Sequence, residues 1–166
     1  MESQQPAIIK KIMDFKLDLP RFFGNGKASL LSNGENKFLE FFFEVPKNQE
    51  KVNSQIIQIL NIWKTSKAHW IFKYSDHQNL NSDQKFISYK VHFESPGKIK
   101  KITNQYVKWD KDLINEIMKT CLDACIFFRE KNIRSVITEG NMFLVEKYGL
   151  KTVKLFPIID PRFDMF

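Results

Sequence analysis

Residues 37–46 read KFLEFFFEVP, and this stretch decides the fold class of the chain. Leu39, Phe41, Phe43 and Val45 alternate with other side chains, a period of two that predicts a strand with one buried face. Pro46 predicts the end of that strand, because proline cannot donate a ladder hydrogen bond. This is the clearest strand pattern in the sequence, and it predicts a domain built around a sheet.

The patterns on either side supply the other elements. Helices are expected over residues 49–66 and 110–131, where apolar side chains recur at helical spacing, and a short helix over residues 142–148 that ends at Gly149. Strands are expected over residues 13–19, 69–75, 85–94, 99–109, 134–138 and 151–159. The sequence therefore predicts an α/β (α+β) fold, with a largely antiparallel sheet and helices packed on it. We expect one domain over residues 1–166, with a strand-and-turn extension (1–36), a core (37–160) and a tail (161–166).

Composition limits the classes of function. The 166 residues include 16 Phe, which predicts an aromatic core, and 26 Lys+Arg against 19 Asp+Glu, a net charge of +7. This excess favours an acidic partner such as nucleic acid, a phosphate-bearing ligand or an anionic membrane surface. No apolar run is long enough to insert into a membrane, and no signal-peptide pattern opens the chain. We therefore expect a cytoplasmic protein, with Cys121 and Cys125 packed as small apolar side chains.

From residue 37 onward the expected order of elements resembles that of the GCN5-related N-acetyltransferase (GNAT) fold. Residues 144–150, LVEKYGL, resemble the short helix and turn that this family usually writes L-Y-E-K-x-G-F. The resemblance implies a GNAT-like core, an acyl-CoA cofactor and an N-acyltransferase activity. The family's general-acid Tyr corresponds to Val145, and Tyr148, three residues further on, is a catalytic candidate outside the family's pattern.

The cofactor loop departs from the family's pattern. GNAT proteins hold the CoA pyrophosphate on a loop with the consensus R/Q-x-x-G-x-G/A, and residues 105–110 read QYVKWD, so only Gln105 matches. Lys108 and Lys111 are the candidate cations for the pyrophosphate. Asp110 and Asp112 add negative charge where it would lie, at the start of the long helix. We therefore predict that acetyl-CoA binds weakly or not at all.

Other polar residues suggest other chemistry. His92 and Glu94 share one face of an expected strand, where they form either a base with its orienting partner or part of a solvated surface. No His or Cys spacing indicates a metal site. The segment 98–109 combines cations with Tyr106 and Trp109, the parts of a surface for single-stranded nucleic acid. Its candidate cations are Lys98, Lys100, Lys101 and Lys108, and a solvated strand with a buried Trp explains the pattern as well.

Three functions remain open at this point. The first is an acyltransferase-like domain with degenerate or altered cofactor binding. The second is a non-catalytic basic module for nucleic acid, and the third is a non-catalytic module for a protein partner, presenting exposed Phe side chains and the tail. The sequence identifies neither a substrate nor an oligomeric state, and a homodimer is compatible with each function.

Overall fold

The computed structural model describes residues 8–19, 23–34, 36–80, 85–94, 97–133, 135–156 and 158–159. Its elements, in chain order, are β1 (Ile9–Lys16), β2 (Gly26–Asn33), β3 (Asn36–Pro46), α1 (Glu50–Thr65), β4 (Tyr74–Leu80), β5 (Phe86–Glu94), β6 (Lys98–Lys101), α2 (Lys111–Glu130), β7 (Ser135–Val136), a 3-10 turn (Glu139–Asn141), β8 (Met142–Lys147), β9 (Leu150–Leu155) and β10 (Ile158–Ile159). Strands and helices in one core, with every strand pair antiparallel, confirm the predicted α+β class. Neither described helix is apolar enough over a sufficient length to cross a membrane.

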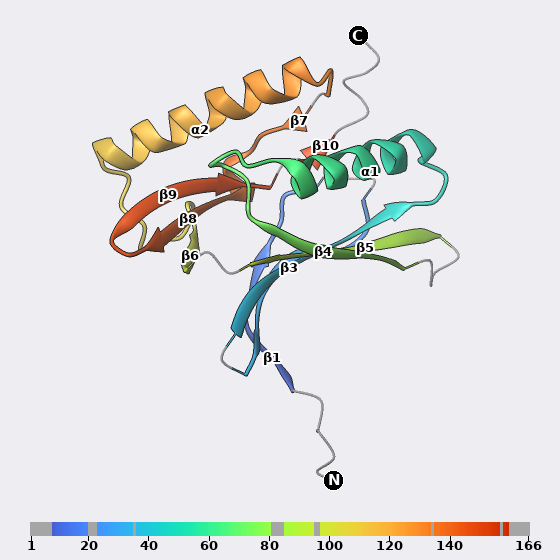
Figure 1. The fold of residues 1–166 in the computed structure, drawn as a ribbon, viewed down its shortest axis with the longest axis horizontal. Coiled ribbons are helices and arrows are strands. Elements are labelled where there is room, and N and C mark those ends of the chain that lie inside the picture. The colour runs from blue at the N-terminus through green and yellow to red at the C-terminus, as the bar shows by residue number, and fades with distance from the viewer. Residues whose placement is uncertain are drawn as a thin grey trace.

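The larger sheet has five strands in the order β1-β2-β3-β5-β4, and α1 lies over one of its faces (Figure 1). The predicted alternation in β3 is confirmed, because Leu39, Phe41, Phe43 and Val45 are all buried. Helix α1 buries one apolar stripe, as its spacing predicts. The register is set by which face of each strand is buried, since a shift of one residue would turn that face to solvent.

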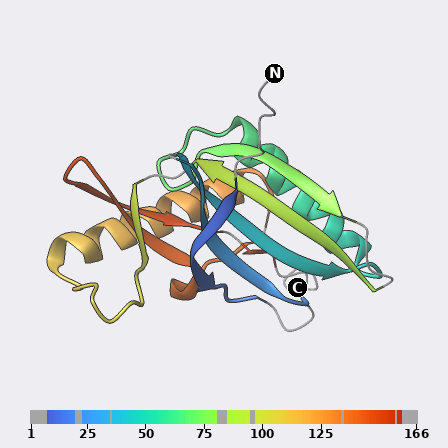
Figure 2. The same ribbon diagram turned by 90° about the horizontal axis from the view of Figure 1, so that it is seen from below.

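The smaller sheet has three strands in the order β6-β8-β9 and lies beside the larger one (Figure 2). Helix α2 packs on this sheet through Leu113, Thr120, Ala124 and Phe128, which are its buried residues. The buried Thr120 hydroxyl donates a hydrogen bond of 3.2 Å to the carbonyl oxygen of Val153 in β9. A separate short pair, β7 with β10, follows α2 along the chain.

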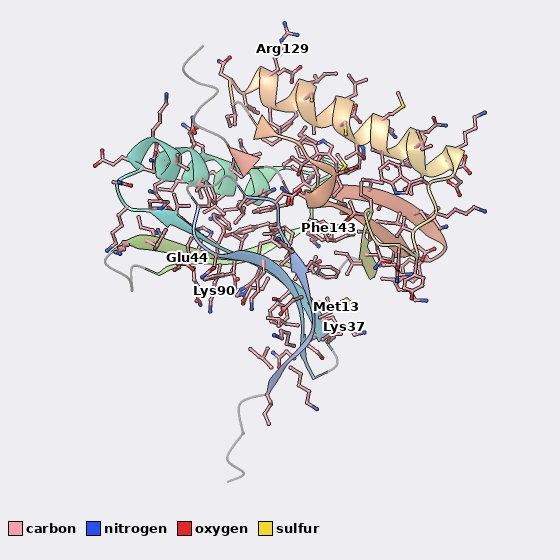
Figure 3. All side chains as sticks on the ribbon, turned by 180° about the vertical axis from the view of Figure 1, so that it is seen from behind. Met13, Lys37, Glu44, Lys90, Arg129 and Phe143 are labelled. Atoms are coloured by element: carbon pink, nitrogen blue, oxygen red, sulfur yellow. The ribbon has the colours of Figure 1, made fainter. Side chains whose placement is uncertain are left out.

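Aromatic rings join the two sheets, which confirms the aromatic core that the composition predicts. The Phe143 ring of β8 lies 5.6 Å from Phe15, 6.1 Å from Phe41 and 5.7 Å from Phe72, measured between ring centroids (Figure 3). Phe41 also contacts Phe156, at 4.5 Å. The space between the sheets is therefore filled by side chains of the protein itself.

The short helix expected over residues 142–148 is wrong, because these residues form strand β8 and the start of a hairpin turn. Phe143 and Val145 are buried and Glu146 and Lys147 are not, the period of two that a half-buried strand requires. Tyr148 and Gly149 have φ values of +54° and +77°, as in the two-residue type I′ turn that suits a hairpin. The seven residues that carry the resemblance to the GNAT family are thus a hairpin.

Two expected strands are also misplaced. The strand predicted over residues 99–109 ends at Lys101, and a series of turns follows, in which the Trp109 indole N–H donates to the carbonyl oxygen of Ile102 at 2.8 Å. The apolar run at residues 70–72 is a buried turn, and the strand that follows it, β4, lies in the polar stretch 74–80 that sequence reasoning assigned largely to a loop. In both places tertiary burial, which no local pattern encodes, decided the outcome.

The described Phe residues are either buried or partly exposed. The partly exposed ones, which put some Phe surface in contact with solvent, are Phe23, Phe38, Phe42, Phe86 and Phe127. The tail over residues 161–166, the other feature assigned to a protein partner, lies outside the described residues.

Candidate functional site

A basic concave surface lies where β6 meets the β8–β9 hairpin and the start of β3. A cavity of about 930 Å³ opens there. We call it the lysine groove, and its charged and aromatic lining consists of Lys37, Lys98, Lys100, Lys147, Glu146 and Tyr148. Four ammonium groups therefore face one carboxylate, and the electrostatic potential of the groove favours an anion.

Strand pairing explains why these lysines gather. Lys98 stands opposite Glu146, and Lys100 opposite Leu144, in the β6–β8 register. Gly97 allows the approach, because its φ is +121° and a Cβ there would lie 2.4 Å from the Glu146 carbonyl oxygen. Lys37 is the second residue of β3 and pairs with Ser32 of β2, near the β2–β3 connection (Figure 3).

The structure brings together two of the four lysines predicted for nucleic acid. Lys98 and Lys100 line the lysine groove, whereas Lys101 turns toward β1 and donates to the carbonyl oxygen of Lys16. Burial lowers the pKa of Lys101, which also separates it from a surface role. Lys108 lines a neighbouring cavity, which Lys100 and Glu146 also line. Sequence reasoning missed Lys37 and Lys147. The Lys-Tyr-Gly turn of the hairpin was the only signal for Lys147, and Lys37 had no comparable signal.

Tyr148 stands at the tip of the β8–β9 hairpin with 92% of its surface exposed. The Lys147 ammonium lies 5.5 Å from the centroid of its ring, within the range of a cation–π contact. Tyr148 also lines a second cavity, of about 360 Å³, together with Lys73, Glu94, Lys147 and Leu150 among others. No hydrogen bond to the Tyr148 hydroxyl is formed by a described residue, so this catalytic candidate has no orienting partner there.

The candidate cofactor site lies at the start of α2, in a cavity of about 600 Å³. Lys108 lines it, and Gln105 and Lys111 do not, so one of three predicted cofactor residues is in place. Asp110 caps the helix, since its carboxylate accepts the Leu113 N–H at 2.9 Å. Asp112 and Glu116 add further carboxylates to the lining. Acyl-CoA binding stays a prediction, and the charges at this helix end disfavour a pyrophosphate.

His92 and Glu94 do not form the predicted pair. His92 bridges three strands, with Nδ1 2.6 Å from the Asp76 carboxylate and Nε2 2.8 Å from that of Glu40. Glu94 instead lies 3.3 Å from the Lys73 ammonium. Both imidazole nitrogens are thus engaged by carboxylates, and neither is free to take a proton from a ligand. Among the described residues no cluster of His, Cys, Asp or Glu is arranged to hold a metal ion.

The loop after β1 is tied to the turn before β8, a contact that we call the Asp18–Asn141 clasp. The Asn141 side chain accepts the Asp18 N–H at 2.7 Å and donates to the Asp18 carbonyl oxygen at 2.8 Å. Thr138 adds a longer bond, 3.3 Å, to the Asp18 carboxylate. Gly140 is required here, because a Cβ would lie 1.8 Å from that carboxylate. Sequence reasoning identified residues 140–141 only as a turn.

Comparison with known proteins adds no relative, since no protein-family model and no curated protein matches the chain.

Proposed function

We propose that the chain is a non-catalytic module that binds nucleic acid at the lysine groove. The observation that carries this proposal is the convergence of four lysines from β3, β6 and β8 on one cavity with a single opposing carboxylate. Lysines spaced along a groove suit a phosphate backbone, because each contact releases condensed counterions. The net charge of +7 supports the same class of ligand.

The proposal that the module is non-catalytic rests on the side chains in the interior of the fold. Protein kinases carry a Gly-rich loop, then a Lys on the third strand, a Glu on the helix that follows, and later a catalytic loop H-R-D-x-x-x-x-N. The β1–β2 connection, β3, α1 and the turn that ends in Asn141 occur here in a similar order. Because the order of elements is similar, the interior side chains can be compared with those that phosphoryl transfer requires.

At three of the positions where phosphoryl transfer needs a charged group, this chain carries a different residue. The buried side chains of β3 are Leu39, Phe41, Phe43 and Val45, with no Lys, and the buried stripe of α1 holds no Glu. Val136 stands five residues before Asn141, in the place of the catalytic Asp. Asn141 itself is engaged in the clasp. An interior of this kind supports a binding role and disfavours an enzymatic one.

Fluorescence anisotropy with a labelled single-stranded oligonucleotide, over a series of salt concentrations, tests the binding. We expect log K to fall with log salt with a slope of about −3 if all four lysines contact phosphates, at roughly −0.7 for each contact. The double variant Lys98→Gln, Lys100→Gln should lose about half of that slope. The matched control, Lys64→Gln with Lys67→Gln, changes two exposed lysines that lie outside the groove and should leave the slope unchanged.

Equal slopes for the two double variants, or no binding even at low salt, would reject the lysine groove as the site. Calorimetry tests the non-catalytic part with acetyl-CoA and, separately, with Mg-ATP, each at about 1 mM, the concentration at which a Kd corresponds to about −4 kcal/mol. We expect no heat of binding from either ligand. A micromolar Kd for one of them would show that the module has the cofactor site of an enzyme.

A further inference from the structure

Tyr148 occupies a backbone conformation that its side chain disfavours. Its φ of +54° is in the left-handed region, and the first position of a type I′ turn is dominated by Asn, Asp and Gly. A bulky residue with positive φ is uncommon, and such outliers gather at functional sites. The ring gains little packing in return, because 92% of the residue is exposed. The folded chain alone therefore gives no reason for an aromatic residue at this position.

The surroundings of the ring do suggest a reason. Tyr148 lines both the lysine groove and the second cavity, and Lys147 lines both as well. Lys37, Lys98 and Lys100 line the first of these cavities, and Lys73 lines the second, where the Glu94 carboxylate lies 3.3 Å from its ammonium. A strand that followed the lysines from one cavity into the other would pass over the tyrosine. Leu150, 72% exposed, extends the apolar surface beside it.

We infer that Tyr148 is a stacking platform for an unpaired base, and that the ligand of the lysine groove is single-stranded nucleic acid. This inference rests on the proposed function and names its class of ligand. Single-strand binding surfaces combine cations along the backbone with aromatic rings on which bases stack. A duplex keeps its bases stacked inside, and a polyanion without bases has nothing to place on the ring, so neither would use Tyr148.

The test compares Tyr148→Asn with the wild type on three labelled ligands of equal length: a single strand, the corresponding duplex and an abasic strand. Asn suits the left-handed conformation, so the hairpin should persist and the melting temperature should be unchanged or higher. We expect the single strand to bind about 5- to 150-fold more weakly, the loss typical of one stacked base. Affinity for the duplex and the abasic strand should not change, and the salt slope should stay the same because no lysine is removed.

Two further variants make the result specific. Tyr148→Phe retains the ring and should keep the affinity for the single strand. Tyr106→Asn removes another exposed ring, 79% exposed and outside the lysine groove, and should have no effect. If Tyr148→Phe weakened binding as much as Tyr148→Asn, the hydroxyl would be responsible and stacking would be excluded.

The outcomes distinguish a failure of stacking on Tyr148 from a failure of the proposed binding at the lysine groove. Unchanged single-strand affinity in Tyr148→Asn, with a loss in the Lys98, Lys100 double variant, would overturn stacking and leave the lysine groove as the binding site. An equal loss for all three ligands would also overturn stacking, because the change would act on the hairpin rather than on a base. If the wild type bound none of the ligands, both the inference and the proposed function would be wrong.

Discussion

Replacing Asn141 by Ala should destabilise the protein, because the Asn141 side chain holds the Asp18–Asn141 clasp together. The amide makes two hydrogen bonds to the Asp18 backbone, at 2.7 and 2.8 Å, and Asn141 is only 1% exposed. Each such bond contributes about 1 kcal/mol net, and a buried partner left unsatisfied costs more. We therefore expect the free energy of unfolding to fall by about 2–3 kcal/mol. For a chain of this size the melting temperature should fall by about 4–12 °C.

Urea unfolding followed by circular dichroism measures this change, with Asn61→Ala as the matched control. Asn61 lies on the exposed side of α1, so its replacement should change the free energy of unfolding by no more than about 0.5 kcal/mol. Asn141→Asp keeps an acceptor for the Asp18 N–H but removes the donor and adds a charge beside the Asp18 carboxylate. It should lose at least as much stability at neutral pH as Asn141→Ala. If Asn141→Ala matched the wild type within about 0.5 kcal/mol, the clasp would not contribute to stability.

Two further predictions concern the core. Phe143→Ala should lower the free energy of unfolding by about 3–5 kcal/mol in urea titrations, since Phe143 is fully buried among aromatic rings, and Phe143→Leu should lose clearly less. Tyr89→Phe should cost about 1–2 kcal/mol at neutral pH, because the Tyr89 hydroxyl donates to the Asn53 amide oxygen at 2.6 Å. Burial raises the pKa of Tyr89, so the stability that it contributes is present below the unfolded value of about 10 and is lost as the pH rises through the folded value. The difference in unfolding midpoint between the wild type and Tyr89→Phe should therefore be smaller at alkaline pH than at neutral pH. A difference that stayed constant with pH would contradict this reasoning.

Much of the fold could be predicted where one local pattern was compatible with one structure. The alternation in β3 had no competing interpretation and is confirmed. Helix α2 forms where its spacing predicts it, but the face that was expected to be buried is largely wrong. Ile114, Met118, Leu122 and Cys125 are exposed, because α2 packs through Leu113, Thr120, Ala124 and Phe128 instead. Residues 142–148 were different, because Met, Leu, Glu and Lys favour helices while the order of burial fits a strand. Residues 142–147 form a strand because β8 pairs with both β6 and β9. The resemblance to the GNAT family assumed a helix in this segment, and that helix does not form.

The candidate site was predictable only in its local part. Lys98 and Lys100 are neighbours on one strand, so their common face follows from the period of two. Lys37 and Lys147 reach the same cavity from strands distant in the sequence, and only the sheet topology places them there. The Asp18–Asn141 clasp was hidden for the same reason, since an Asn beside a Gly ordinarily indicates nothing more than a turn.

The way the hairpin is anchored bears on how Tyr148 would work. Below the tip, Phe143, Val145, Val153 and Leu155 are each at most 2% exposed, and α2 packs against β9. Because the turn has only two residues, the exposed Tyr148 ring is attached directly to the buried part of the hairpin. A rigid support reduces the conformational entropy that binding would otherwise cost, so an exposed ring presented in this way favours stacking more than the same ring on a long loop would. This predicts that inserting two glycines between Tyr148 and Gly149 should weaken single-strand binding as Tyr148→Asn does, although the ring is retained. Undiminished affinity in that insertion variant would show that the orientation of the ring is irrelevant to binding.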